Sequence, residues 1–319
     1  MPRYRHALPQ HGERLFLTDG GIETTLIFHD GLELPHFAAF DLLKTAEGTA
    51  ALERYFRGYA GIATRLRTGL ILESATWRAN PDWGARLGYS EAELAQANRK
   101  AVELLVEIRE SMPQELPVVL SGCIGPRADG YDPGETMTPA AAEAYHSWQI
   151  DVLAETDVDM VCALTIAYSE EAIGMARAAR KANMPIALAF TVETNGRLPT
   201  GQSLEEAVAE VDAATRNWPE YYMINCAHPT HFEFVLDVAK PWTSRLKGVR
   251  ANASMRSHAE LNAADRLDTG NPAVLAVEHA ALKRRLPGLT VFGGCCGTDC
   301  RHVEQIALAC GPLFETVEA

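Results

Sequence analysis

The chain has 319 residues, of which 47% are hydrophobic and 22% are charged, the ordinary composition of a globular protein. Its formal net charge of −13, with no block of lysine and arginine, argues against a nucleic-acid partner or an anionic membrane surface. No apolar stretch approaches the ~18 residues of a membrane-spanning helix, and the first residues carry no signal-peptide core, so we expect a cytoplasmic protein. The sequence leaves open whether the chain forms a homo-oligomer.

Short β-branched segments alternate with longer segments of helical period along the whole chain. Ser90 followed by Glu93 has the pattern of a capping box, which predicts the start of one helix. The predicted strands span residues 14–21, 69–76, 116–121, 159–166, 185–193, 221–226, 246–251 and 289–294. The predicted helices span residues 47–67, 90–111, 139–156, 169–183, 203–215, 231–239, 271–285 and 299–310.

Eight strand–helix units in a chain of this length favour an α/β fold closed into a (β/α)8 TIM barrel over an open doubly wound sheet. No linker rich in proline, glycine or serine divides the sequence, so we expect residues 1–319 to form a single domain. The loops after strands two, three and seven are long. In such a barrel they lie at the C-terminal face of the strands, where active sites are found.

Cysteines stand at the ends of two predicted strands. Cys226 ends the sixth strand, and Cys295 and Cys296 end the eighth within a Gly-Gly-Cys-Cys-Gly segment. Seven cysteines in a chain without an export signal favour thiol or metal chemistry over a disulfide framework. Because the strand ends of a barrel meet at one face, the three thiolates can converge there and leave a fourth zinc position open, as catalytic zinc sites do.

The two adjacent cysteines can share one metal only if the backbone leaves β geometry, because successive residues of a strand point to opposite faces. Three glycines allow this departure, namely Gly293, Gly294 and Gly297. Cys300, expected a turn into the last helix, is a rival ligand, and Cys123 near the end of strand three is a weaker one. Cys162 and Cys310 are interpreted as core residues.

An open zinc position can take either a substrate thiol or water. Zinc deprotonates a coordinated thiol, whose ordinary pKa is about 8.5, and three thiolates leave the centre with a net charge of about −1. This charge favours alkyl transfer onto sulfur over the generation of hydroxide. Three hypotheses follow: a thiol alkyltransferase, a zinc hydrolase, and a binding protein whose structural zinc is closed by Cys300 or His302.

With these residues in place, the sequence resembles the homocysteine S-methyltransferase family over most of its length. The motifs that carry the resemblance are Asp19-Gly20-Gly21, Thr76-Trp77, the turn at residues 121–126, Asn225-Cys226 and the segment 293–298. The resemblance implies a zinc-dependent barrel enzyme that moves a methyl group from a sulfonium, ammonium or methylcobalamin donor onto homocysteine. It also implies three cysteine ligands for the zinc and an Asp19 carboxylate that holds the ammonium group of the acceptor.

Two segments depart from the pattern of the family. Where the family has a Glu-Thr pair at the end of strand four, this chain has Leu164 and Thr165, and the segment 251–258 also differs. Glu193, at the end of strand five, is a candidate to replace the missing carboxylate; its alternative role is that of an exposed loop acid. The chain has no room for cobalamin and folate modules, which favours a free small-molecule donor.

The sequence thus predicts a Zn2+-dependent S-methyltransferase that takes a methyl group from a small sulfonium or betaine-like donor. The expected acceptor is a thiol, foremost homocysteine, which would give methionine. A zinc hydrolase and a different thiol acceptor are the alternatives. The predicted catalytic residues are Asp19 and Glu193, the substrate-binding residues are Thr76, Trp77, Thr165, Asn225 and Asn252, and the zinc ligands are Cys226, Cys295 and Cys296.

Overall fold

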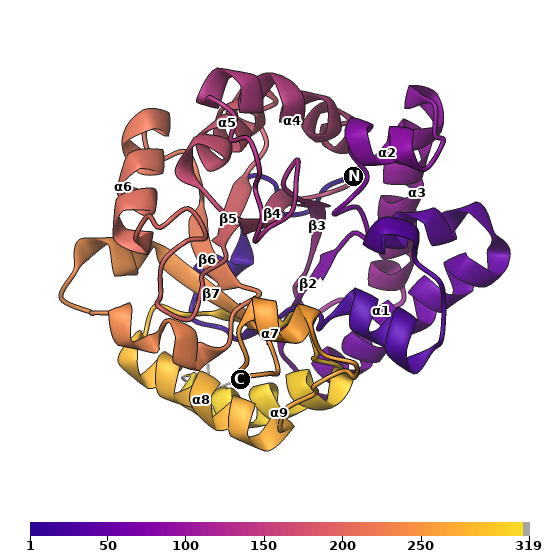
Figure 1. The fold of residues 1–319 in the computed structure, drawn as a ribbon. Helices are drawn as coiled ribbons and strands as arrows, with labels where there is room; N and C mark the ends of the chain where they lie inside the picture. The colour runs from indigo at the N-terminus through magenta and orange to yellow at the C-terminus, as the bar shows by residue number, and fades with distance from the viewer. Residues whose placement is uncertain (315–319) are drawn as a thin grey trace.

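Eight parallel strands form a closed barrel in sequence order in the computed structural model, which describes residues 1–314. Figure 1 looks along the barrel, with the strands at the centre and most helices in a ring around them. The first and last strands close the barrel by pairing Phe16 with Val291 and Leu17 with Phe292. The predicted (β/α)8 TIM barrel is therefore confirmed.

The strands are short, and most of the helices are longer. The strands are β1 (Phe16–Leu17), β2 (Gly69–Glu73), β3 (Val118–Ile124), β4 (Met160–Ile166), β5 (Ile186–Phe190), β6 (Tyr221–Asn225), β7 (Leu246–Ala251) and β8 (Val291–Gly294). The helices are α1 (Ala46–Leu66), α2 (Pro81–Arg86), α3 (Glu91–Glu110), α4 (Pro139–Ala154), α5 (Ser169–Lys181), α6 (Leu204–Thr215), α7 (His258–Asn262), α8 (Pro272–Arg285) and α9 (Cys300–Cys310).

Side chains alternate along each strand between two apolar cores. In β2, Leu70 and Leu72 belong to the core between strands and helices, whereas Ile71 belongs to the smaller core inside the barrel. Residues two apart on a strand share a face. Glu73 therefore points into the barrel with Ile71, and Arg250 of β7 does the same because its neighbour Val249 belongs to the outer core. The interior thus carries charged groups at the end where the strands finish.

The predicted start of the second long helix is confirmed in atomic detail. The Ser90 hydroxyl accepts a hydrogen bond from the Glu93 amide at 3.3 Å, and the Ser90 amide donates to the Glu93 carboxylate at 2.8 Å. These two bonds satisfy backbone donors that the first turn of α3 would otherwise leave unpaired.

The helix predicted over residues 231–239 is wrong. The structure has two single 3-10 turns there, Pro229–His231 and Glu233–Val235, followed by an extended Leu236. Pro241 keeps the residue before it, Lys240, out of helical geometry, and a helix confined between two prolines is too short to gain cooperative stability. The predicted first strand, 14–21, is also shorter in the structure, where only Phe16–Leu17 is strand.

Long loops surround the C-terminal end of the barrel. The predicted long loops after β2, β3 and β7 are present, and the loop after β1, residues 18–45, is a further long one that the sequence analysis did not single out. Within the loop after β7, α7 lies over the barrel opening in Figure 1 instead of joining the outer ring. No helix within residues 1–314 is long and apolar enough to cross a membrane.

Candidate active site

A cavity of about 870 Å³ opens at the C-terminal end of the barrel. Its walls come from residues of β2, β3, β4, β6 and β7 and from the loops after every strand except β4. Two phenylalanines of the loop after β1, Phe28 and Phe37, line it and are more than half exposed. The cavity is therefore large enough for two small substrates, and part of its mouth is apolar.

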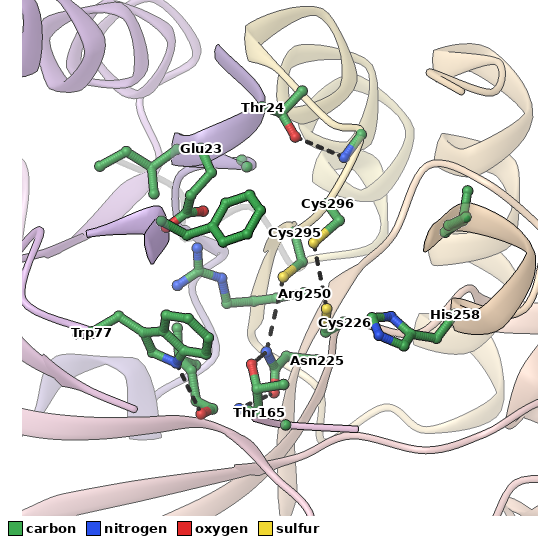
Figure 2. A pocket seen from close by; sticks show the side chains of 18 of the residues that line it. Glu23, Thr24, Trp77, Thr165, Asn225, Cys226, Arg250, His258, Cys295 and Cys296 are labelled. Carbon is green, nitrogen blue, oxygen red and sulfur yellow. Dashed lines mark hydrogen bonds between the residues drawn. The ribbon is translucent and has the colours of Figure 1, made fainter. Parts of the chain in front are cut away.

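Three cysteine sulfurs meet at one side of this cavity (Figure 2). The Sγ atoms of Cys226, Cys295 and Cys296 lie within 4.8 Å of one another, and those of Cys226 and Cys296 are 3.5 Å apart. Tetrahedral zinc with Zn–S bonds of ~2.3 Å requires sulfurs about 3.8 Å apart, so this donor set fits zinc. Within residues 1–314, no fourth histidine, cysteine, aspartate or glutamate joins the cluster.

The backbone around the cysteines explains how they converge. Cys226 has a left-handed conformation with φ of 57°, and its carbonyl accepts hydrogen bonds from the Tyr131 hydroxyl and from Asn252 Nδ2, the latter at 2.7 Å. Gly297 has φ of +79° and donates its amide to Thr24 Oγ1 at 2.9 Å. The chain thus leaves β geometry on both sides of the cluster, as the pair of adjacent cysteines required.

The two glycines at the end of β8 are needed because neighbouring side chains lie where a Cβ atom would be, and not because their φ angles are unusual. A Cβ atom at Gly293 would lie 1.9 Å from Thr18 Oγ1, and one at Gly294 would lie 2.0 Å from Thr298 Oγ1. Neither glycine is among the residues with positive φ. Only Gly297 provides the backbone freedom that the sequence analysis assigned to all three glycines.

The rival ligands lie elsewhere. Cys300 packs against α1, where a Cβ atom on Gly58 would meet its sulfur at 2.9 Å. The His302 ring contacts Asp299 through Nδ1 at 3.1 Å and the Thr269 carbonyl through Nε2 at 2.8 Å. Cys123 belongs to the core inside the barrel. The structure therefore brings neither Cys300 nor His302 to the cluster as a closing ligand.

Asp19 lies in a buried ion network beside the cysteines. One of its carboxylate oxygens pairs with Arg250 Nη2, and the other accepts a hydrogen bond from the Tyr55 hydroxyl at 2.8 Å. Arg250 Nη1 lies 3.3 Å from the carboxylate of Glu73. Burial raises the pKa of Asp19, which Arg250 opposes, and raises that of Glu73 to about 7. Burial alone would lower the pKa of Arg250, but the two carboxylates outweigh it and hold this pKa well above its usual value.

Thr165 and Asn225 line the cavity together and hold each other. The Thr165 amide donates to Asn225 Oδ1 at 2.8 Å, and Asn225 Nδ2 donates to Thr165 Oγ1 at 2.9 Å. The same Nδ2 lies 3.9 Å from Cys295 Sγ (Figure 2). Thr165 has φ of 64°, a conformation that β-branched residues rarely adopt, so these bonds fix a strained turn against the cysteine cluster.

Trp77, predicted to bind substrate, and Glu193, predicted to be catalytic, both line the cavity. Trp77 Nε1 donates to the Leu164 carbonyl at 3.3 Å, and the Arg78 guanidinium lies 4.4 Å from the centre of the Trp77 ring. Glu193 is half-buried. Burial lowers the pKa of His258, and the charges of Asp129 and Glu193 oppose this shift.

Two residues predicted to bind substrate do not line the cavity. Thr76 is buried beneath it and donates its hydroxyl to the Cys123 carbonyl at 2.7 Å. Asn252 is buried beside Cys226 and donates to its carbonyl. Both side chains therefore contact the backbone that forms the walls of the site.

Several residues of the site escaped the sequence analysis. Arg250 could have been found, because an arginine at an inward position of an apolar strand needs a buried acidic partner. Glu23 follows Asp19 by four residues in the loop after β1. Tyr131 stacks on His258, with ring centres 3.9 Å apart, and nothing in the sequence links these two residues because they belong to different loops.

Comparisons with known proteins agree with this geometry. The family model for homocysteine S-methyltransferase matches residues 16–310. A selenocysteine Se-methyltransferase of Brassica oleracea var. italica is 25% identical over 260 residues, which are 74% of this chain and 73% of that protein.

Solved structures agree in fold. The homocysteine methyltransferase MmuM of Escherichia coli in its oxidized form has a TM-score of 0.76 and 20% identity, and the match covers 96% of this chain and 99% of that one. The metallated form of MmuM has a TM-score of 0.72 and 19% identity, with 95% and 98% of the chains covered. Because the family model spans almost the whole barrel, the chain belongs to the homocysteine S-methyltransferase family and is a methyltransferase.

Proposed function

We propose that the chain is a zinc-dependent S-methyltransferase that moves a methyl group from a small sulfonium or betaine-like donor to a thiol, with homocysteine as acceptor and methionine as product. The observation that carries the proposal is the open cluster of Cys226, Cys295 and Cys296 in the wall of the cavity. Membership of the family supports methyl transfer to a thiol. Cytoplasmic location and a single domain over residues 1–319 stay predictions from the sequence.

The three thiols would hold the zinc. When bound, zinc would lower the pKa of a substrate thiol, so that the thiol ionises at neutral pH. Tyr131 and Asn252 support this by fixing the Cys226 carbonyl from two different loops, and Asn225 supports it from beside Cys295. Groups that orient metal ligands in this way typically change metal affinity 10- to 100-fold when they are removed.

The reaction needs a thiolate and a methyl carbon in line with the bond that breaks. The acceptor sulfur forms a new S–C bond, and the electron pair of the broken bond stays on the leaving sulfur or nitrogen, which becomes neutral. No general acid is required, so catalysis rests on nucleophile activation and alignment in the cavity. Trp77 and the apolar mouth residues would help to exclude water from the donor.

Of the two alternatives, a hydrolase is disfavoured because three thiolates make a centre that suits a soft sulfur nucleophile better than hydroxide. An acceptor other than homocysteine is favoured by one observation: Leu164 provides no charge, and both oxygens of Asp19 already have partners. The name of the Brassica relative suggests selenocysteine as a separate alternative, which this observation does not favour because selenocysteine also carries an ammonium group.

The test is a matrix of acceptors and donors with the zinc-loaded protein. Homocysteine, its selenium analogue and desamino-homocysteine are each combined with a small sulfonium, a betaine and no donor, and methylated products are quantified by mass spectrometry. The proposal predicts methionine from homocysteine only when an onium donor is present. Hydrolysis of the donor without methylation of any acceptor would support the hydrolase instead.

A further inference from the structure

Glu23 is one of four carboxyl groups of the cavity wall that have no side-chain partner among residues 1–314; the others are Asp132, Glu193 and Asp265. Glu23 lines the cavity and is half-buried, and within residues 1–314 its carboxylate has no ion pair and no side-chain partner. The other carboxylates close to the cysteines differ. Asp19 contacts Arg250 and Tyr55, and Glu73 lies beside Arg250. A half-buried carboxylate without a partner is costly unless a ligand supplies one.

The segment that carries Glu23 is fastened to the cysteine loop. The hydroxyl of Thr24, the residue after Glu23, accepts a hydrogen bond from the Gly297 amide at 2.9 Å. Two residues before it, the Gly21 amide donates to the Thr298 carbonyl at 3.1 Å. Figure 2 shows Glu23 on one side of the cysteines and His258 on the other, with the Thr24 bond beside Cys296. Glu23 is therefore held in a fixed place relative to the thiols that would hold the zinc.

An amino-thiol acceptor brings an ammonium group into the cavity along with its sulfur. A buried ammonium needs an anionic partner. Position 164 offers only an apolar side chain, and the Asp19 oxygens are already bound, one to a guanidinium. Resting on the proposed function, we infer that Glu23 binds the ammonium group of the acceptor and makes the site specific for amino-thiols.

The surroundings of Glu23 agree with a role completed by a ligand. Burial raises its pKa to about 7, and the Cys295 thiol and the Asp19 carboxylate add to this, whereas Arg78 opposes it. Arg78 itself lies over the rings of Trp77 and Trp83, at 4.4 Å and 3.7 Å from their centres, and near Asp129. A bound ammonium would stabilise the ionised form of Glu23 that burial disfavours.

Glu193 is the rival for this role, as the sequence analysis proposed. It lies on the side of the cavity where its charge acts on His258, and its backbone pairs with Arg197 within its own loop. No described bond joins that loop to the cysteines. Glu23 is therefore better placed to bind the cation of a molecule whose sulfur is held by the cysteine cluster.

The experiment compares acceptor binding in Glu23→Gln, Glu193→Gln and the wild type, all zinc-loaded. Calorimetry measures the affinity for homocysteine and for desamino-homocysteine, and steady-state kinetics give KM for acceptor and donor. Glu103→Gln, an exposed acid of α3, is the matched control. Thermal melting of each variant checks folding, and Glu23→Asp keeps the charge as a second, conservative variant.

The inference predicts that Glu23→Gln weakens homocysteine binding about 10- to 100-fold and leaves desamino-homocysteine binding and the donor KM unchanged. Adding Leu164→Glu to Glu23→Gln should partly restore homocysteine binding. Equal weakening of both acceptors, a change in donor KM alone, or a loss confined to Glu193→Gln would overturn it. If the wild type binds both thiols and transfers methyl groups, and Glu23→Gln binds homocysteine as tightly as the wild type does, only this inference fails. If the wild type binds neither thiol, the proposed function fails with it.

Discussion

The Asp19 carboxylate and the Arg250 guanidinium form a buried ion pair between the loop that follows β1 and strand β7. The strands β1 and β7 flank β8. Arg250 also donates its Nε hydrogen to the Gly294 carbonyl at 3.2 Å, one residue before the paired cysteines. The ion pair therefore stabilises the end of β8, which Cys295 and Cys296 follow. It also occupies the Asp19 carboxylate, which could otherwise bind a cationic group of a substrate.

Replacing Arg250 with glutamine should destabilise the protein by about 3–5 kcal/mol, because two carboxylates would remain buried without their cation. Urea unfolding of the wild type and the variant measures this loss. Arg65→Gln, which breaks an exposed ion pair with Glu304, is the matched control and should cost about 1 kcal/mol or less. Equal effects of the two substitutions would show that the buried pair adds nothing to stability.

Replacing Cys226 with serine should remove most of the zinc and nearly all methyl transfer, since two thiols do not complete the donor set. Cys300→Ser should keep full zinc, because Cys300 packs against α1 outside the cluster. Metal analysis after dialysis, together with turnover, checks both variants. Stoichiometric zinc in an active Cys226→Ser protein would refute the assignment of the ligands.

Tyr131→Phe should weaken zinc binding about 10-fold, because it removes one of the two side-chain donors that hold the Cys226 carbonyl. Competition with a coloured chelator measures the affinity. Tyr145→Phe removes a hydroxyl that donates to Asn80 at 2.9 Å outside the cluster, and it should leave zinc affinity unchanged. The account is contradicted if both variants bind zinc as the wild type does.

Glu23 should make the stability of the protein depend on pH. Its pKa is raised to about 7 by burial, so the folded state binds the proton more tightly than the unfolded chain. The stabilisation is fully present below the ordinary glutamate pKa of about 4.3 and is lost as the pH rises through 7. Cys295, Asp19 and Arg78 act on the same group, so the quantity to measure is the difference between wild type and Glu23→Gln. Urea unfolding should show the wild type losing stability relative to Glu23→Gln as the pH rises from about 4 to about 7; a constant difference would contradict the prediction.

Peroxide should inactivate the enzyme reversibly. The Cys226 and Cys296 sulfurs are 3.5 Å apart, and Cys296 is exposed, so oxidation can join them and release the metal. Reductant followed by zinc should restore activity, whereas reductant with a chelator should not. Full activity of the oxidised, metal-free protein would argue against a role for the cluster.

The barrel and the cysteine cluster could be predicted because each has a local signal. The alternation of strand and helix segments predicts the fold, and Cys226, Cys295 and Cys296 stand at strand ends, which a barrel brings together. The partners of the cluster could not be predicted in the same way. Tyr131 and Asn252 reach the same carbonyl from loops after different strands, and the conformations of these loops depend on tertiary contacts.

The partners of the buried polar side chains at the site were the hardest part to predict. The resemblance assigns Asp19 to the acceptor, but only the structure shows Arg250 bound to it. Thr76 is predicted to end a strand next to Trp77, yet β2 ends at Glu73, and in the loop that follows the Thr76 hydroxyl donates to the Cys123 carbonyl.

The central claim is tested most directly by methyl transfer from a small onium donor to homocysteine, measured with one preparation in zinc-loaded and zinc-depleted forms. The account predicts methionine from the loaded form, its loss on depletion, its return when zinc is added, and no product from Cys226→Ser under any of these conditions. Equal methionine formation by loaded, depleted and Cys226→Ser proteins would contradict a catalytic role of the zinc site. Failure of every onium donor to methylate any thiol would contradict the proposed reaction.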